Sequence, residues 1–188
     1  MDNETLRKVQ LTQLGIAKDI VAICEKHSIK VFLDSGSLIG AIRHKGFIPW
    51  DDDLDVGMPR DDYEIFLKEG QKHLPSYYFI QSMYSECELL FNMAKIRDSR
   101  TTFIETSIKN SRINHGIYID IFPLDYYPEK PKQQKCFDWQ RRLLGWRIRR
   151  EFTPINENKG TKRKELIQKA VGTLLCIKYP RVREAIIA

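Results

Sequence analysis

Four aspartates lie within five positions of this chain, at Asp51, Asp52, Asp53 and Asp55. Side chains alternate between the two faces of a β-strand, so Asp53 and Asp55 would point the same way, with Cα atoms roughly 6.5–7 Å apart. Carboxylates held this close repel one another unless a cation lies between them. Mg²⁺ prefers a few carboxylates together with phosphate oxygens, and a pair of such ions can hold attacking and leaving oxygens in line. The segment therefore predicts metal-dependent phosphoryl transfer with Asp53 and Asp55 as ligands, and with Asp51 as a further ligand if the strand begins early.

The acidic run has two other interpretations. Aspartates can cap a structure or solvate a turn, and this is the favoured interpretation for Asp52, which would lie on the opposite strand face. A calcium-binding loop that starts at Asp51 would need glycine at its sixth position and glutamate at its twelfth. The chain has Val56 and Asp62 at those positions, so the sequence argues against a calcium loop.

A further carboxylate, Asp120, lies between two aromatic residues on one face of a strand predicted at 116–122. An ionised carboxylate is costly in such a place unless a metal ion or an arginine pairs with it. If this strand lies beside the acidic run, Asp120 completes a site of three carboxylates with Asp53 and Asp55. Asp120 would then act both as a metal ligand and as the base for an acceptor hydroxyl. A structural ion pair or hydrogen bond is the alternative.

Gly36 and Ser37 lie between a strand predicted at 29–33 and a helix predicted at 38–44. Glycine lets a phosphate approach the backbone, and the helix N-terminus and the serine hydroxyl can donate hydrogen bonds to it. Many turns contain Gly-Ser, so the pair by itself is a weak signal. Its position just upstream of the acidic run favours a phosphate-binding role.

Cationic and aromatic side chains surround these segments. Arg43 lies between Gly36 and the acidic run, and Lys95 and Arg97 share one face of a predicted strand. All three cations are placed to neutralise phosphate charge, with the balancing of nearby carboxylates as the alternative. Trp50 would stack on a base or a sugar ring in one interpretation, but a core tryptophan that anchors the loop is the favoured one.

The remaining pattern predicts an α+β fold with α/β-like features. Apolar residues at helical spacing predict a long N-terminal helix at 4–27. Further segments are assigned from their apolar periodicity, as strands at 29–33, 54–58, 77–81, 89–96, 101–105 and 116–122, and as helices at 38–44, 61–71, 132–152 and 162–178. This order predicts a mixed sheet first and helices last. Prolines mark a linker near position 128, so we expect a catalytic core at 1–128 and a basic helical region at 129–188.

Composition narrows the class of protein. The 188 residues carry a net charge of +6, but residues 129–188 alone hold 16 Lys and Arg against 6 Asp and Glu. Such a region favours anionic partners. The four cysteines form no CxxC pair, and no apolar run approaches the about 18 residues of a membrane span. Together with a polar, acidic N-terminus, these features predict a cytoplasmic protein without a zinc knuckle.

Two segments resemble a known family. Residues 36–55, which read GSLIGAIRHKGFIPWDDDLD, closely resemble the signature of the LicD family, and residues 119–125, IDIFPLD, resemble its second landmark. Residues 95–98 and the end of the first helix at 24–27 are also similar. LicD proteins are phosphocholine transferases that decorate bacterial surface glycans, and they are related to the fukutin-type transferases. The resemblance covers roughly residues 5–127.

The resemblance implies a nucleotidyltransferase-type fold and transfer of a phosphoryl-alcohol from a CDP-linked donor, often CDP-choline, to a sugar hydroxyl. Mg²⁺, or Mn²⁺ in its place, would assist, and the acceptor would be a lipopolysaccharide, a teichoic acid or a capsule. The family pattern maps its Gly-Ser loop onto Gly36 and Ser37, and its carboxylates onto Asp53, Asp55 and Asp120. Family members usually continue into a Tyr-Gly-rich C-terminal segment that this sequence lacks, so we expect a shortened chain.

Two other functions fit parts of the sequence. Nucleotidyl transfer with release of pyrophosphate would use the same carboxylates. A non-catalytic protein that binds an anionic glycan or nucleic acid would rely on the basic region instead, although no nucleic-acid motif is recognisable. Basic and aromatic residues at 133–152 would also permit peripheral contact with the inner face of the cytoplasmic membrane, where a lipid-linked acceptor would be presented, but packing against the core is the favoured interpretation.

Overall fold

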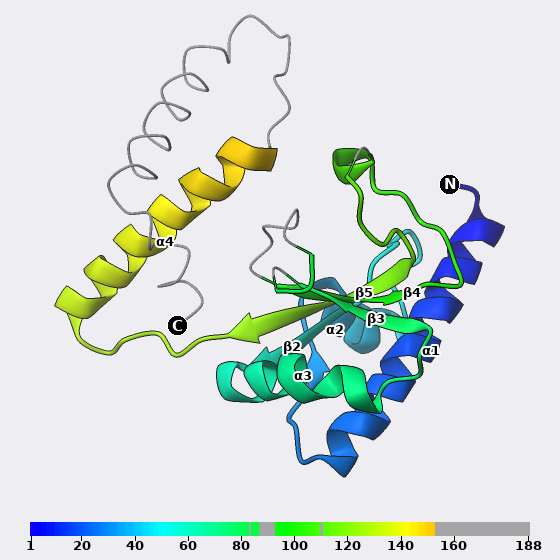
Figure 1. The fold of residues 1–188 in the computed structure, drawn as a ribbon, viewed down its shortest axis with the longest axis horizontal. Helices are drawn as coiled ribbons and strands as arrows, with labels where there is room; N and C mark the ends of the chain where they lie inside the picture. Colours follow the sequence, from blue (N-terminus) through cyan, green and yellow to red (C-terminus); the bar gives the residue numbers. More distant parts are fainter. Residues whose placement is uncertain (83, 87–92, 110, 153–188) are drawn as a thin grey trace, which may run out of the picture. The chain divides into compact units, whose positions relative to one another are not determined.

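The computed structural model describes residues 1–82, 84–86, 93–109 and 111–152. Those within Met1–Tyr126 form a sheet with helices around it (Figure 1). In chain order the elements are α1 (Asn3–Lys26), β1 (Phe32–Leu33), α2 (Ser35–His44), β2 (Asp55–Pro59), α3 (Arg60–His73), β3 (Tyr78–Gln81), β4 (Ala94–Asp98), the short 3₁₀ helix η1 (Thr106–Ile108), β5 (Ile117–Leu124) and α4 (Pro131–Phe152). The long N-terminal helix predicted from the sequence is confirmed. It begins where the Asp2 carboxylate accepts a hydrogen bond from the Thr5 N–H at 2.8 Å, a typical N-cap.

The five strands form one mixed sheet in the order β1-β2-β5-β4-β3. β2 and β5 run parallel, and the other three pairs are antiparallel. The predicted α+β class with a mixed sheet is therefore confirmed. The parallel pair lies near the middle of the sheet, so its residues are covered on both edges by neighbouring strands.

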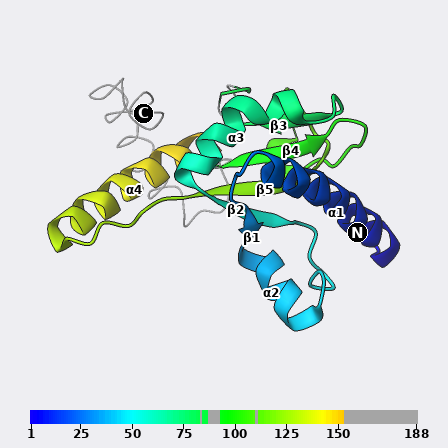
Figure 2. The same ribbon diagram turned by 90° about the horizontal axis from the view of Figure 1, so that it is seen from below.

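One face of the sheet is apolar and carries the hydrophobic core. Its residues include Val56, Ile96 and Ile121, which cluster with Ile16 of α1 and Phe66 of α3. α1 and α3 both contact these strands, and Figure 2 shows α3 and α2 on opposite sides of the sheet. Two helices thus cover the core face, and α2 stands on the other side.

The other face of the sheet is polar. The strand register places Gln81, Lys95, Asp120 and Asp55 next to one another in a row across β3, β4, β5 and β2. Paired residues on neighbouring strands point to the same face. The alternation predicted around Asp120 therefore separates an aliphatic core from a row of polar and charged side chains.

Several segment boundaries differ from the sequence prediction. β2 begins at Asp55, so Asp53 precedes the strand. α2 begins at Ser35 and so extends over the predicted Gly-Ser loop. Residues 101–105 form an irregular loop where a strand was expected, because the Phe103 N–H donates to the His115 carbonyl in a single bond outside the ladder. The helix predicted at 162–178, and part of the strand predicted at 89–96, lie outside the described residues.

Met1–Tyr126 and Tyr127–Ala188 form two separate compact units. In the described part of the second unit, α4 matches the helix predicted at 132–152. The Tyr127 hydroxyl donates to the Asp138 carboxylate at 3.1 Å, and its ring contacts Phe137 edge-on. Over the described residues, no helix combines the length and apolar character that crossing a bilayer requires.

Gly40 lets α2 pack against the backbone that leads into the acidic run. A Cβ at this position would lie 2.6 Å from the Gly46 carbonyl oxygen and 3.0 Å from the Ile48 nitrogen. Gly40→Ala should therefore lower the free energy of unfolding by about 1–3 kcal/mol, because two backbone segments must separate. Gly15 in α1 has open space instead, so Gly15→Ala should raise it by about 0.5–1 kcal/mol. Urea denaturation of both variants checks this pair, and changes of the same sign would contradict it.

Candidate functional site

The carboxylates of the acidic run gather where β2 begins. Asp55, the first residue of β2, pairs in register with Asp120 of β5, and these residues are only 8% and 6% exposed. Asp51 and Asp53 are half-buried just before the strand, whereas Asp52 is exposed. The structure thus brings together the aspartates predicted as ligands and turns Asp52 to solvent.

Burial and mutual repulsion raise the pKa values of these carboxyls. Burial raises the pKa of Asp55 to about 6, and the charges of Asp53, Asp120, Asp51 and Asp34 add to the effect. Burial also raises the pKa of Asp51, as do the charge of Asp53 and a hydrogen bond with it. A proton or a cation would relieve this repulsion.

The donor set fits a hard divalent cation. It consists of carboxylate oxygens, which Mg²⁺ and Mn²⁺ prefer, and lacks the thiolates and imidazoles that select softer metals. No group of three or more His, Cys, Asp or Glu residues is arranged as a metal site in the described part of the chain. Binding would therefore require the aspartate side chains to rotate towards a common centre, which would remove their mutual repulsion.

The first turn of α2 lies against the acidic cluster. Asp34 caps the helix by accepting a hydrogen bond from the next backbone N–H at 2.8 Å, and its own N–H donates to the Asp55 carbonyl oxygen. Ser37 Oγ accepts a hydrogen bond from the Asp55 N–H at 2.8 Å. A Cβ on Gly36 would lie 3.0 Å from a carboxylate oxygen of Asp51. The predicted phosphate-loop residues therefore lie directly beside the carboxylates, and the Ser37 hydroxyl also positions Asp55.

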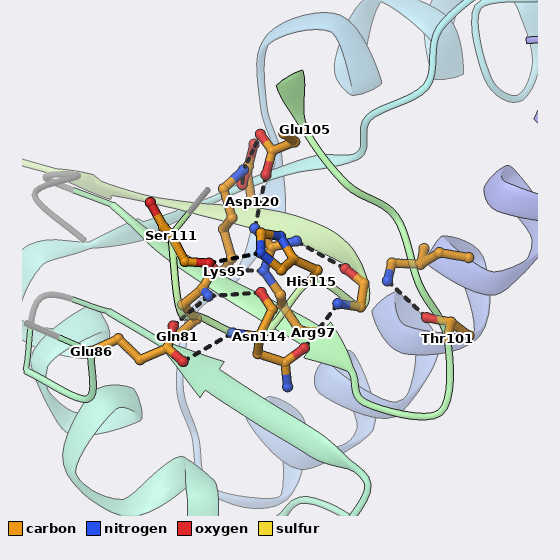
Figure 3. A network of polar contacts seen from close by, with 12 residues as sticks. Gln81, Glu86, Lys95, Arg97, Thr101, Glu105, Ser111, Asn114, His115 and Asp120 are labelled. Atoms are coloured by element: carbon orange, nitrogen blue, oxygen red, sulfur yellow. Dashed lines mark hydrogen bonds and ion pairs between the residues drawn. The ribbon is translucent and has the colours of Figure 1, made fainter. Parts of the chain in front are cut away.

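Lys95 is the cation that pairs with Asp120. Its Nζ lies 2.8 Å from Asp120 Oδ1 and 3.6 Å from Glu105 Oε1 (Figure 3). The same atom lies 3.6 Å from the centre of the Tyr118 ring. Burial raises the pKa of Asp120, and the opposing effect of Lys95 is too small to reverse it. We expected a metal ion or an arginine to pair with Asp120, and the structure shows a lysine in this role.

Arg97 faces the protein interior. Its guanidinium donates to Gln81 Oε1 at 2.6 Å, to the Gly116 carbonyl oxygen at 2.9 Å and to Glu105 Oε2 at 2.8 Å. The residue is 0% exposed. The interpretation of Arg97 as a residue that touches the donor is therefore corrected: its contacts make it a positioning residue for Glu105 and the ends of the neighbouring strands.

Sequence reasoning missed Glu105. It joins Lys95 to Arg97, with ion pairs to both at 3.6 Å and 2.8 Å. Burial would raise the pKa of Glu105, but the charges of Lys95 and Arg97 outweigh burial and hold the pKa below its usual range. The interpretation of 101–105 as a strand gave no reason to place this carboxylate beside the two cations.

Two other predicted residues lie at the surface. Arg43 is exposed in the last turn of α2, about 10 Å along the helix axis from Gly36. Its role in neutralising phosphate charge stays a prediction. Trp50 is 76% exposed, with its ring edge-on to His44 at 6.2 Å, so the interpretation of a core tryptophan is wrong.

Comparison with known proteins identifies relatives of this chain. Residues 28–156 match the family model described as LicD/FKTN/FKRP, nucleotidyltransferase domain. The chain is 40% identical over 133 residues to the lipopolysaccharide cholinephosphotransferase LicD of Haemophilus influenzae. The aligned residues make up 70% of this chain and 49% of that protein. It is 36% identical over 122 residues to the uncharacterized protein RP689 of Rickettsia prowazekii, which covers 65% of this chain and 42% of that protein.

A shorter match reaches a human protein. Over 46 residues the chain is 41% identical to the ribitol 5-phosphate transferase FKRP of Homo sapiens, which covers 24% of this chain and 9% of that protein. The chain spans about half the length of the Haemophilus relative.

Asp55→Asn should stabilise the metal-free protein at pH 8. The folded-state pKa of about 6 lies above the ordinary value of 3.8, so ionisation of Asp55 opposes folding. This penalty is complete above pH 6 and fades as the pH falls from 6 towards 4. Removal of the charge should raise the free energy of unfolding at pH 8 by about 1 kcal/mol, a value discounted for solvent screening.

Urea denaturation in EDTA at pH 8 and at pH 4.5 measures this difference. Asp52→Asn is the control, because Asp52 is exposed in the same segment and should change stability little at either pH. An Asp55→Asn variant that is less stable than the wild type at pH 8 would contradict the prediction.

Proposed function

Because the chain belongs to the LicD/FKTN/FKRP family, we propose that it transfers a phosphoryl-alcohol from a nucleotide-linked donor to a hydroxyl group of a glycan. The observation that carries this proposal is the pairing of Asp55 with Asp120 beside the first turn of α2. Carboxylates for a cation and backbone N–H groups for a phosphate then lie side by side. A nucleotidyltransferase-type reaction centre needs both.

Asp53, Asp55 and Asp120 would hold Mg²⁺ or Mn²⁺, with Asp51 as a further ligand. Such an ion, when bound, supplies charge neutralisation at the phosphates of the donor. The raised pKa of Asp55 supports this assignment, because crowded carboxylates gain most from a divalent cation.

The side chains around the ion would divide the remaining work. The N-terminus of α2, with Gly36 and Ser37, would donate hydrogen bonds to a phosphate oxygen. Asp120 would accept the proton of the acceptor hydroxyl, and burial raises its pKa towards the range that suits a base. Lys95 would stabilise negative charge that develops beside Asp120. Arg43, which is exposed on α2, would neutralise phosphate charge of the donor.

The names of the relatives suggest the transferred group. We propose phosphocholine from CDP-choline, because the cholinephosphotransferase LicD matches over 133 residues, whereas the ribitol 5-phosphate transferase FKRP matches over 46. By the same argument the acceptor would be a cell-surface glycan such as lipopolysaccharide.

A lipid-linked acceptor would be reached from the inner face of the cytoplasmic membrane. α4 carries basic side chains that are exposed to solvent, namely Lys132, Lys135, Arg141 and Arg142. Such residues can contact anionic lipid head groups. We include this peripheral contact in the proposal.

Calorimetric titration of CDP-choline into the protein tests the proposal. We expect binding in the presence of Mg²⁺ and its loss in EDTA. Asp53→Asn should weaken binding by about 10-fold or more, because a metal ligand is removed. Asp52→Asn is a control in the same segment and should bind within about twofold of the wild type, since the Asp52 side chain is exposed and its charge is the last of the effects on Asp51.

The reaction products distinguish this function from its alternatives. Release of CMP from CDP-choline in the presence of a glycan acceptor supports phosphoryl-alcohol transfer. Release of pyrophosphate from CTP would indicate nucleotidyl transfer instead. Binding of a polyanion with a steep salt dependence, unchanged by Asp53→Asn, would favour a non-catalytic binding protein.

A further inference from the structure

Two glutamines of α1 bind the backbone of the acidic run. Gln10 and Gln13 are only 4% and 1% exposed. Gln10 Nε2 donates to the Asp51 carbonyl oxygen at 2.9 Å and lies 3.4 Å from that of Ile48. Gln13 Nε2 donates to the Asp52 carbonyl oxygen at 2.8 Å. The donors and acceptors are about 40 residues apart in sequence, so only the packing of α1 brings them together.

These positions lie on the buried side of an amphipathic helix. Val9 and Ile16 are buried on the same side of α1, and an aliphatic residue would suit positions 10 and 13 if packing were the sole requirement. A primary amide is costly to bury unless it forms hydrogen bonds. The Nε2 donors of Gln10 and Gln13 therefore bind carbonyl oxygens of the acidic run, while Gln10 Oε1 accepts a hydrogen bond from Arg7 at 3.2 Å.

The segment that they bind is anchored at its end by Leu54, whose side chain lies in the core and whose carbonyl oxygen accepts a hydrogen bond from the Asp120 N–H at 2.9 Å. Residues 48–54 form neither helix nor strand, although they carry Asp51 and Asp53. Its own backbone contributes a turn, in which the Asp51 N–H donates to the Ile48 carbonyl oxygen at 3.1 Å. The repulsion between carboxylates acts to spread this segment, and hydrogen bonds from a rigid helix oppose that spread.

We propose that Gln10 and Gln13 are positioning residues that hold the backbone of the acidic run in place, so that the side chains of Asp51 and Asp53 can turn towards a common divalent cation. The proposal rests on the proposed function, because it assumes that the cluster binds a metal ion. Outer partners that orient metal ligands typically change metal affinity by about 10- to 100-fold when they are removed.

A substitution at Gln13 can change the acidic run with little change in overall stability, because only one end of its amide forms a hydrogen bond within the described part of the chain. Nε2 is bonded to Asp52, whereas Oε1 is buried without a hydrogen-bond partner among the described residues. Gln13→Met keeps the side-chain volume and removes the donor together with this unsatisfied acceptor. The loss of a bond and the relief of a buried polar atom oppose each other, so the melting temperature should change little.

Gln71, an exposed residue of α3, provides a control away from the acidic run. It bridges α3 and β3 with both ends of its amide, donating to the Tyr78 carbonyl oxygen at 2.9 Å and accepting from the Ile80 N–H at 2.8 Å. This bridge has no contact with the acidic run. Gln71→Met should therefore lower the melting temperature more than Gln13→Met does, yet leave the metal site unchanged.

The test is calorimetric titration of Mn²⁺ alone into the full chain, with melting curves of the same samples. We expect the Mn²⁺ Kd to rise about 10-fold in Gln13→Met and further in the Gln10→Met/Gln13→Met double variant. Gln71→Met should stay within about twofold of the wild type. Wild-type affinity in the double variant, or an equal loss in Gln71→Met, would overturn the proposal.

Amide hydrogen exchange separates a failure of this proposal from a failure of the proposed function. If the wild type does not bind Mn²⁺, the metal-dependent function fails at that step. The Asp51 and Asp55 amides, which are hydrogen-bonded in the metal-free protein, then report on the glutamines directly. Faster exchange in Gln13→Met but not in Gln71→Met supports the positioning role, and unchanged exchange in both variants overturns it.

Discussion

The parallel pairing of β2 with β5 is the constraint on which the rest of this structure depends. Its register sets Asp55 beside Asp120, and both carboxylates are almost fully buried. Two acids this close resist ionisation, and burial adds to the effect. Lys95 offsets part of this cost by pairing with the Asp120 side chain, and Ser37 Oγ fixes the Asp55 backbone by accepting a hydrogen bond from its N–H. The candidate site is thus a cluster of mutually repelling carboxylates that neighbouring strands and the first turn of α2 hold together.

The sheet separates these carboxylates from the hydrophobic core. On one face aliphatic residues pack against α1 and α3. On the other, the buried cations Lys95 and Arg97 pair with the buried Asp120 and with Glu105, which is partly exposed. Such a set is costly to break, because removal of one member leaves its partner charged and buried. Tyr118 lies under both cations, with its ring 3.6 Å from Lys95 Nζ and 4.5 Å from the Arg97 guanidinium carbon. The network therefore fixes the side-chain positions around Asp120 before any ligand arrives.

The part of the chain that matches the LicD/FKTN/FKRP family contains this whole arrangement, from α2 to β5. The described core supplies carboxylates, a helix N-terminus and an internal ion-pair network, all within Met1–Tyr126. α1 lies entirely outside the family match, yet it contributes the glutamines that bind the acidic run. The backbone of the acidic run is thus hydrogen-bonded to a helix that precedes the matched region.

Local patterns in the sequence determined the helix at the N-terminus, the mixed sheet and the aspartates at its centre, because alternation and spacing are set by neighbouring residues. Tertiary structure alone decided which groups those aspartates meet. Lys95 pairs with Asp120, and Arg97 turns inward to Glu105, because of strand register and a loop that no local pattern predicts. Trp50 is 76% exposed, although the sequence favoured a position in the core. Contacts between segments far apart in the chain are fixed by the global fold, and this is why the sequence located the carboxylates but not their partners.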